Sequence, residues 1–156
     1  MTRELLAFSL TFTIGAIVGH IAIPRGSVMA QSSKPMFMTR LYTGADNQTH
    51  SEEVEVKFSG GGESNAVSKM MQVTGAELHR AAPGRVSDWH RGPRRQYVIT
   101  LSGRGEVEVA GGKKISLEPG HIDLVEDTTG KGHITRSTGT EDRVTLTLPL
   151  ADQSGK

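Results

Sequence analysis

The stretch Asp88–Gly103 gathers polar side chains at the start of an apolar run. Its sequence, DWHRGPRRQYVITLSG, places one histidine, three arginines and one glutamine before the apolar residues. An imidazole can hold a metal ion or move a proton. A guanidinium can bind a carboxylate or a phosphate through two parallel hydrogen bonds. The stretch therefore indicates two kinds of chemistry, metal binding and anion binding.

The anion-binding interpretation uses five neighbouring residues. Arg91, Arg94 and Arg95 could clamp an acidic ligand. Trp89 could stack on a ring of that ligand, and Gln96 could donate or accept a hydrogen bond. The alternative is that the arginines pair with nearby acids and that the tryptophan packs against its neighbours. Both interpretations stay open for this candidate ligand-binding set.

The elements that position these residues are predicted to be strands. After residue 35, short segments of alternating apolar and polar residues recur with turn residues between them. SEEVEVKF places Val54, Val56 and Phe58 on one face, and RVTLTLPL shows the same alternation near the C-terminus. The glycines of residues 110–112 suit a tight hairpin, whereas SGGGESN predicts a flexible loop. No later segment has sustained helical periodicity, so an all-β domain is expected.

Length and composition narrow the architecture. A chain of 156 residues has the size of one domain. Many short antiparallel strands must close into a barrel or cover their edges, which favours a small barrel or jelly roll. The absence of cysteine excludes disulfides and thiolate chemistry. With 18 basic and 17 acidic residues there is no large field to attract nucleic acid.

The intervals around the first stretch resemble the first motif of the cupins. In that motif a glycine is followed by histidine, histidine, glutamate and a second glycine at fixed distances. The matching positions here, with every interval kept, are Gly84, His90, Gly92, Gln96 and Gly103. Two of the family's metal ligands are therefore changed, because glycine replaces the second histidine and glutamine replaces the glutamate.

The second cupin motif is matched more loosely. It begins at Gly120, has Glu126 where the family has proline, and reaches its histidine at His133. Ser137 stands in place of the family's asparagine, and the loop before the histidine is two residues longer. The resemblance covers about residues 36–150.

The resemblance implies a single-domain, RmlC-like jelly-roll β-barrel with polar side chains on inward-facing strand positions. It also implies a divalent metal, namely iron, manganese, nickel or zinc, with His90, Gln96 and His133 as the remaining ligands. Gln96 offers only a neutral carbonyl oxygen, so this ligand set is incomplete. The carboxylates considered as additional ligands are Asp88, Asp123 and Glu126. The alternative is a metal-free pocket in which both histidines are hydrogen-bonded.

The first thirty residues have the features of an export segment. Leu5–Ile23 contains no Lys, Arg, Asp or Glu, and Val28 and Ala30 suit a signal-peptidase site. The predicted organisation is a signal peptide at 1–30, a linker at 31–35, the cupin domain at 36–150 and a polar tail at 151–156. The protein is then periplasmic or secreted. The alternative is an uncleaved membrane anchor at 5–23, with the domain outside the cytoplasm.

Two functions stay open at this point. The first is an exported cupin-domain protein that binds a small molecule, such as a carboxylate or phosphate, without established catalysis. The second is a metal-dependent cupin enzyme of the dioxygenase or isomerase type, with His90 and His133 as ligands. A homodimer formed through edge strands is compatible with both. Resemblance of fold does not choose between the two functions.

Overall fold

The computed structural model describes residues 34–62 and 65–154. The predicted signal peptide at 1–30, the alternative anchor at 5–23 and residues 31–33 of the predicted linker lie outside these ranges. Among the described residues, no helix is long and apolar enough to cross a membrane.

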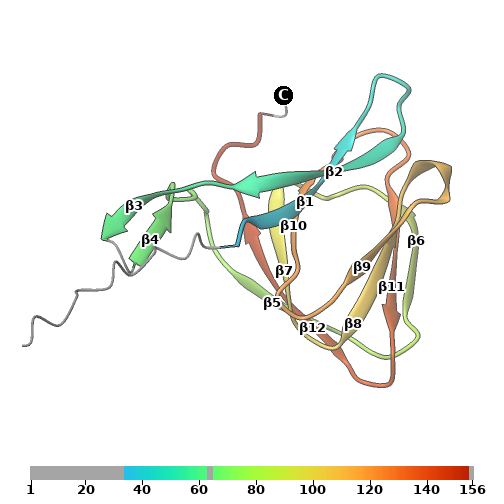
Figure 1. The fold of residues 1–156 in the computed structure, drawn as a ribbon. Coiled ribbons are helices and arrows are strands. Elements are labelled where there is room, and N and C mark those ends of the chain that lie inside the picture. Colours follow the sequence, from blue (N-terminus) through green and yellow to red (C-terminus); the bar gives the residue numbers. More distant parts are fainter. Residues whose placement is uncertain (1–33, 63–64, 155–156) are drawn as a thin grey trace, which may run out of the picture. The chain divides into compact units, whose positions relative to one another are not determined.

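Within these ranges the chain forms strands and a single 3-10 turn (Figure 1). In chain order they are β1 (Met36–Thr43), β2 (Thr49–Val56), β3 (Phe58–Gly62), β4 (Asn65–Ser68), β5 (Glu77–Ala81), β6 (Val86–His90), β7 (Gln96–Ser102), β8 (Arg104–Glu108), the turn η1 (Ala110–Gly112), β9 (Lys114–Leu117), β10 (Ile122–Glu126), β11 (His133–Thr138) and β12 (Arg143–Pro149). The prediction of an all-β domain is confirmed.

The strands form two larger sheets and one small one. The six-stranded sheet has the order β2-β1-β10-β7-β12-β5, and the four-stranded sheet has the order β6-β11-β8-β9. Strands β3 and β4 pair with each other. The pairing of β1 with β10 is parallel, whereas β1 pairs with β2 in antiparallel fashion. Across the described part of the chain, strand pairing does not close the two larger sheets into one barrel. The architecture is consistent with a cupin jelly roll.

A small apolar core joins the inner faces of the two larger sheets. Leu41 and Val125 come from the six-stranded sheet, and Val107 and Leu117 come from the four-stranded sheet. Beyond this core the buried side chains are mostly polar or charged: Thr39, Thr49, Gln96, Thr100, Asp123, Asp127, His133, Ser137, Arg143, Thr145 and Thr147. Hydrogen bonds and bound molecules satisfy buried polar groups. A polar interior is therefore a first indication of a ligand site.

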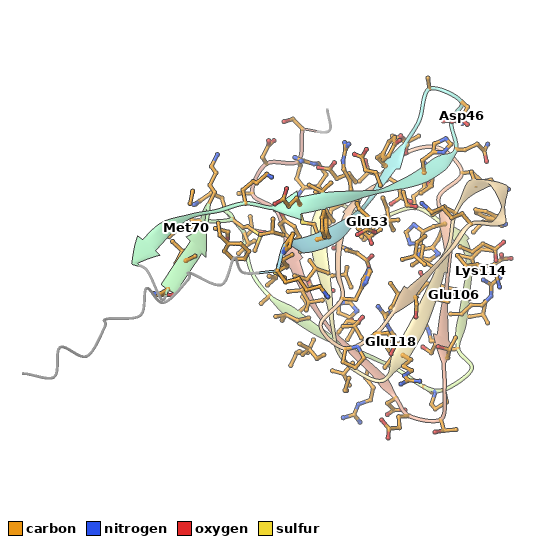
Figure 2. All side chains as sticks on the ribbon, viewed as in Figure 1. Asp46, Glu53, Met70, Glu106, Lys114 and Glu118 are labelled. Carbon is orange, nitrogen blue, oxygen red and sulfur yellow. The ribbon has the colours of Figure 1, made fainter. Side chains whose placement is uncertain are left out.

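Strand β12 buries its polar face. Val144, Leu146 and Leu148 share a face, as the alternation indicates, but they are only partly buried. The buried set on the opposite face is Arg143, Thr145, Thr147 and Pro149. Alternation separates a strand into two faces, but packing decides which face turns inward. Glu106 and Lys114 form a 3.1 Å ion pair on the outside of the four-stranded sheet (Figure 2).

Two of the predicted turns have different outcomes. The hairpin at residues 110–112 is confirmed, because η1 joins the paired strands β8 and β9 with Gly111 and Gly112 at φ of 72° and 75°. The prediction of a flexible loop at SGGGESN is wrong, since residues 59–62 belong to β3 and Asn65 begins β4. Glycine is unfavourable in strands on average, yet backbone hydrogen bonds between strands need no side chain.

Candidate ligand-binding site

A cavity of about 360 Å³ lies between the inner faces of the two larger sheets. Its lining comes from β5, β7, β10 and β12 of the six-stranded sheet and from β6 and β11 of the four-stranded sheet. The lining contains three arginines, three histidines and three threonines, and it contains no aspartate or glutamate. These residues are Arg80, Arg85 and Arg143, His79, His90 and His133, and Thr135, Thr145 and Thr147. The cavity lining therefore contains guanidinium groups and no carboxylate.

His90 and His133 meet at one end of this cavity. They are paired residues of the neighbouring strands β6 and β11, and their ring centroids are 4.5 Å apart at an interplanar angle of 59°. Gly132 permits this close pairing, because it has a φ of 80° and a Cβ there would overlap the backbone carbonyl of His90. The structure thus brings together both predicted imidazoles.

Asp127 orients the ring of His133 through a hydrogen bond. The Nδ1 atom of His133 lies 2.6 Å from Oδ2 of Asp127, and Thr49 Oγ1 donates to the same oxygen at 2.9 Å. Asp127 is fully buried, and its Oδ1 atom has no hydrogen-bond partner in the described part of the chain. Because a carboxylate only accepts hydrogen bonds, Nδ1 of His133 donates to Asp127, and Nε2 is the ring nitrogen directed away from this contact. The sequence analysis missed Asp127 as a site residue, although it continues the inward positions of β10.

His90 is fixed by the backbone. Its Nδ1 atom lies 2.7 Å from the carbonyl oxygen of Asp88. Burial lowers the pKa of His90, and the neighbouring His133 acts in the same direction, while the hydrogen bond to Asp88 opposes them. His90 is therefore neutral at neutral pH, with Nε2 free to accept a hydrogen bond.

Gln96 lines the same cavity, but its carbonyl oxygen is engaged. Gln96 is buried at the start of β7, and its Oε1 atom accepts a 3.2 Å hydrogen bond from Nε of Arg94. The Nη2 atom of Arg94 forms a 2.7 Å ion pair with Glu77. The oxygen that would approach a metal ion therefore faces a guanidinium instead.

The predicted arginines and Trp89 do not line the main cavity. Arg95 donates from Nε to Glu126 at 2.9 Å and from Nη1 to the carbonyl of Asp152 at 2.7 Å. Lys131 Nζ lies 3.8 Å from the centroid of the Trp89 ring. Trp89 and Arg91 line a separate hollow beside the cavity. The assignment of these residues to ligand binding stays a prediction.

The arginines that do line the cavity were not singled out from the sequence. Arg80 and Arg85 are exposed. Arg143 is only 8% exposed, and its Nη2 atom donates to Thr100 Oγ1 at 3.0 Å. The inward parity of Arg143 with Thr145 was available from the sequence, but the inward face of β12 was not.

Gly92 packs where the cupin family has its second histidine. A Cβ added to Gly92 would lie 2.5 Å from Cγ1 of Val125 and 3.4 Å from Oδ1 of Asp127. The backbone N–H of Gly92 donates to the carbonyl of Asp127 at 3.1 Å. The wall of the cavity therefore leaves no space for a side chain at this position unless Val125 moves.

The residues present do not fit the metal site that the cupin resemblance implies. Nowhere in residues 34–62 and 65–154 could a group of three or more His, Cys, Asp or Glu side chains hold a metal ion. The carboxylates considered from the sequence are engaged or exposed: Glu126 pairs with Arg95 and Arg40, Asp123 bonds to His121 at 3.1 Å, and Asp88 is exposed. Two imidazoles and an engaged amide are too few ligands for a strong site.

Comparison with known proteins finds similar solved structures, and several of them are cupins. No protein-family model and no curated protein matches the chain. A cupin domain from Bordetella pertussis Tohama I has 18% identity and a TM-score of 0.41, covering 53% of this chain and 93% of that chain. The Cnp3 cupin domain of Schizosaccharomyces pombe has 16% identity and a TM-score of 0.41, covering 74% and 83%. A cupin-2 domain from Rhodospirillum rubrum has 21% identity and a TM-score of 0.39, covering 76% and 72%.

The chain has a cupin-type fold. A mixed six-stranded sheet and an antiparallel four-stranded sheet enclose a polar cavity, and the two motif histidines are paired on neighbouring strands inside it. The resemblance stated from the sequence motifs is thereby confirmed at the level of the fold. Similarities as distant as those above carry no information about the ligand or the reaction.

Proposed function

We propose that this cupin-domain protein binds a small organic anion in the cavity between its two larger sheets. The observation that supports the proposal is the lining, in which Arg85 and Arg143 bring positive charge and no carboxylate is present. A cleft with charges of one sign concentrates ligands of the opposite sign, and guanidinium groups replace the hydration of an anion with charge-assisted hydrogen bonds.

The rest of the lining suits an organic ligand. Val98 and Val125 provide apolar contact, while Thr135, Thr145 and Thr147 provide hydroxyl groups. Binding sites for small molecules commonly combine apolar walls with a few polar groups that fix orientation. The alternative of a metal-dependent enzyme is not favoured by any contact in the described residues, and the proposal involves no metal.

The proposal predicts stabilisation by organic anions. At a ligand concentration of one hundred times Kd, the free energy of unfolding should rise by about 2.7 kcal/mol, which raises Tm by several degrees. Thermal melts would compare lactate, malate and citrate with the neutral molecules glycerol and glucose at constant ionic strength.

The variant Arg85→Gln should weaken the effect of the anions, whereas Arg80 is left unchanged because its Nε atom lies 3.7 Å from Oδ2 of Asp142. Arg104→Gln is the matched control, because Arg104 pairs with Glu118 at 2.9 Å and does not line the cavity. Equal stabilisation by neutral molecules and anions, or no stabilisation by any of the anions, would contradict the proposal.

We further propose that the protein is exported with cleavage after Ala30. The support is the uncharged run Leu5–Ile23 followed by the small residues Val28 and Ala30. Mass spectrometry of the product from a secretion-competent host should find a chain that begins at Gln31. An intact N-terminus in the membrane fraction would instead identify the anchor at 5–23.

The homodimer also remains a proposal. Leu78 and Leu101 are 71% and 47% exposed on the outer face of the six-stranded sheet. Exposed apolar side chains of this size are common at interfaces between copies of a chain. Light scattering that finds only monomers across the concentration range would exclude the dimer.

A further inference from the structure

Arg143 is a buried cation on the polar inner face of β12. It is 8% exposed and lines the cavity together with Thr145 and Thr147. Side chains two residues apart on a strand are separated by roughly 6–7 Å along its axis. The arginine and the two hydroxyl groups therefore form a row of polar side chains along one wall of the cavity.

The guanidinium of Arg143 has no carboxylate partner in the described part of the chain. Its Nη2 atom donates to Thr100, and its Nε atom is buried without an acceptor. Asp123, whose charge acts on Arg143, hydrogen-bonds to His121 at 3.1 Å instead. The only side-chain hydrogen bond of this guanidinium among the described residues is thus to one neutral hydroxyl group.

Packing fixes this guanidinium in place. A Cβ added to Gly105 on strand β8 of the other large sheet would lie 2.9 Å from both Cδ and Nε of Arg143. Only a glycine at that position leaves room for the arginine side chain. Removing a charge from water is unfavourable, and burial accordingly lowers the pKa of Arg143. An anion in the cavity would offset that cost.

We propose that the cavity takes a short carboxylic acid whose carboxylate binds Arg143, with its other polar end near Gln96 and His90. This inference rests on the proposed binding of organic anions and assigns the residue that receives the charge. A single buried guanidinium balances one negative charge, which suits a carboxylate. The planar fork of a guanidinium also matches the two oxygens of a carboxylate through two parallel hydrogen bonds.

Calorimetric titration with malate tests the assignment. Arg143→Met removes the charge at similar length, and Arg143→Lys keeps the charge but loses the planar fork. We expect Kd for malate to rise roughly ten- to hundredfold in Arg143→Met and by less in Arg143→Lys. Arg104→Met, outside the cavity, is expected to bind malate like the wild type.

Thermal melts in chloride-free buffer without malate give a second readout. If Arg143 serves to bind an anionic ligand, Arg143→Met should melt at the same temperature as the wild type or higher when no ligand is present. The substitution then removes an unpaired buried charge. A marked fall in Tm for both Arg143 variants would show a structural role and overturn the inference. Should Arg143→Met not fold, the NMR signal of the Arg143 Nε–H group, assigned with Arg143→Lys, must shift when malate is added to the wild type.

The outcomes separate this inference from the proposed function. Unchanged malate affinity in Arg143→Met, together with loss in Arg85→Met, would leave anion binding intact and overturn the role of Arg143. Binding of inorganic phosphate in place of malate, dependent on Arg143, would overturn the carboxylate assignment. Failure of malate, lactate and phosphate to bind the wild type would overturn both proposals.

Discussion

Replacing Asp127 with alanine is expected to lower the free energy of unfolding by about 1–3 kcal/mol for each of the two buried donors that lose their acceptor. Asp127 is fully buried, and its Oδ2 atom accepts hydrogen bonds from His133 and Thr49 at 2.6 and 2.9 Å. The substitution leaves the N–H group of His133 and the hydroxyl group of Thr49 without an acceptor. Urea unfolding of the variant and the wild type gives the difference directly.

Two further variants calibrate this prediction. Thr49→Val removes one hydrogen bond to the same oxygen with little change of shape, so a loss of about 1 kcal/mol is expected. Asp88→Ala alters an exposed aspartate and should change stability by less than about 0.5 kcal/mol. If Asp127→Ala were no less stable than Asp88→Ala, the role assigned to Asp127 in holding His133 would be wrong.

The meeting of His90 and His133 followed from sequence spacing. The intervals from Gly84 to Gly103 are those of the first cupin motif, and the structure pairs the two histidines across β6 and β11. The motif positions do not lie on one strand, because His90 ends β6, Gln96 begins β7 and His133 begins β11. The convergence therefore follows from the resemblance to the cupin motifs and not from alternation along a single strand.

The location of the cavity arginines did not follow from the sequence. RVTLTLPL divides into an apolar and a polar set, and the usual burial preference would turn the leucines inward. The structure buries Arg143 and the threonines instead. Local alternation carries no information on which face meets the opposite sheet, so the cationic lining became visible only in the fold.

The position of Arg95 was within reach of the same alternation. Gln96 faces the cavity, so its neighbours on the chain should face away, yet the sequence analysis placed Arg95 with Gln96 in the candidate ligand-binding set. The structure pairs Arg95 with Glu126 and with the carbonyl of Asp152, away from the cavity lining. Arg95 was assigned to the candidate site because it is adjacent to Gln96 in sequence, but of the two side chains only that of Gln96 lines the cavity.

Replacing Gly92 with alanine is expected to lower the free energy of unfolding by about 1–3 kcal/mol, the usual cost of overpacking a well-packed site. The added Cβ would lie 2.5 Å from Cγ1 of Val125, and the described backbone does not place Gly92 at positive φ. The cost is therefore steric and comes from the facing side chain. Gly75→Ala is the matched control, since a Cβ there meets nothing within 4 Å.

A double-mutant cycle with Val125→Ala isolates this contact. Val125→Ala alone destabilises the fold by leaving a cavity, but in that background Gly92→Ala should add little, because the clashing methyl group is gone. Equal effects of Gly92→Ala in both backgrounds would show that Val125 is not the obstacle. If the coupling is found, Gly92→His alone cannot restore the family's second histidine ligand, because Val125 occupies the space that the imidazole would need. The departure from a cupin metal site is then a property of the cavity wall as well as of position 92.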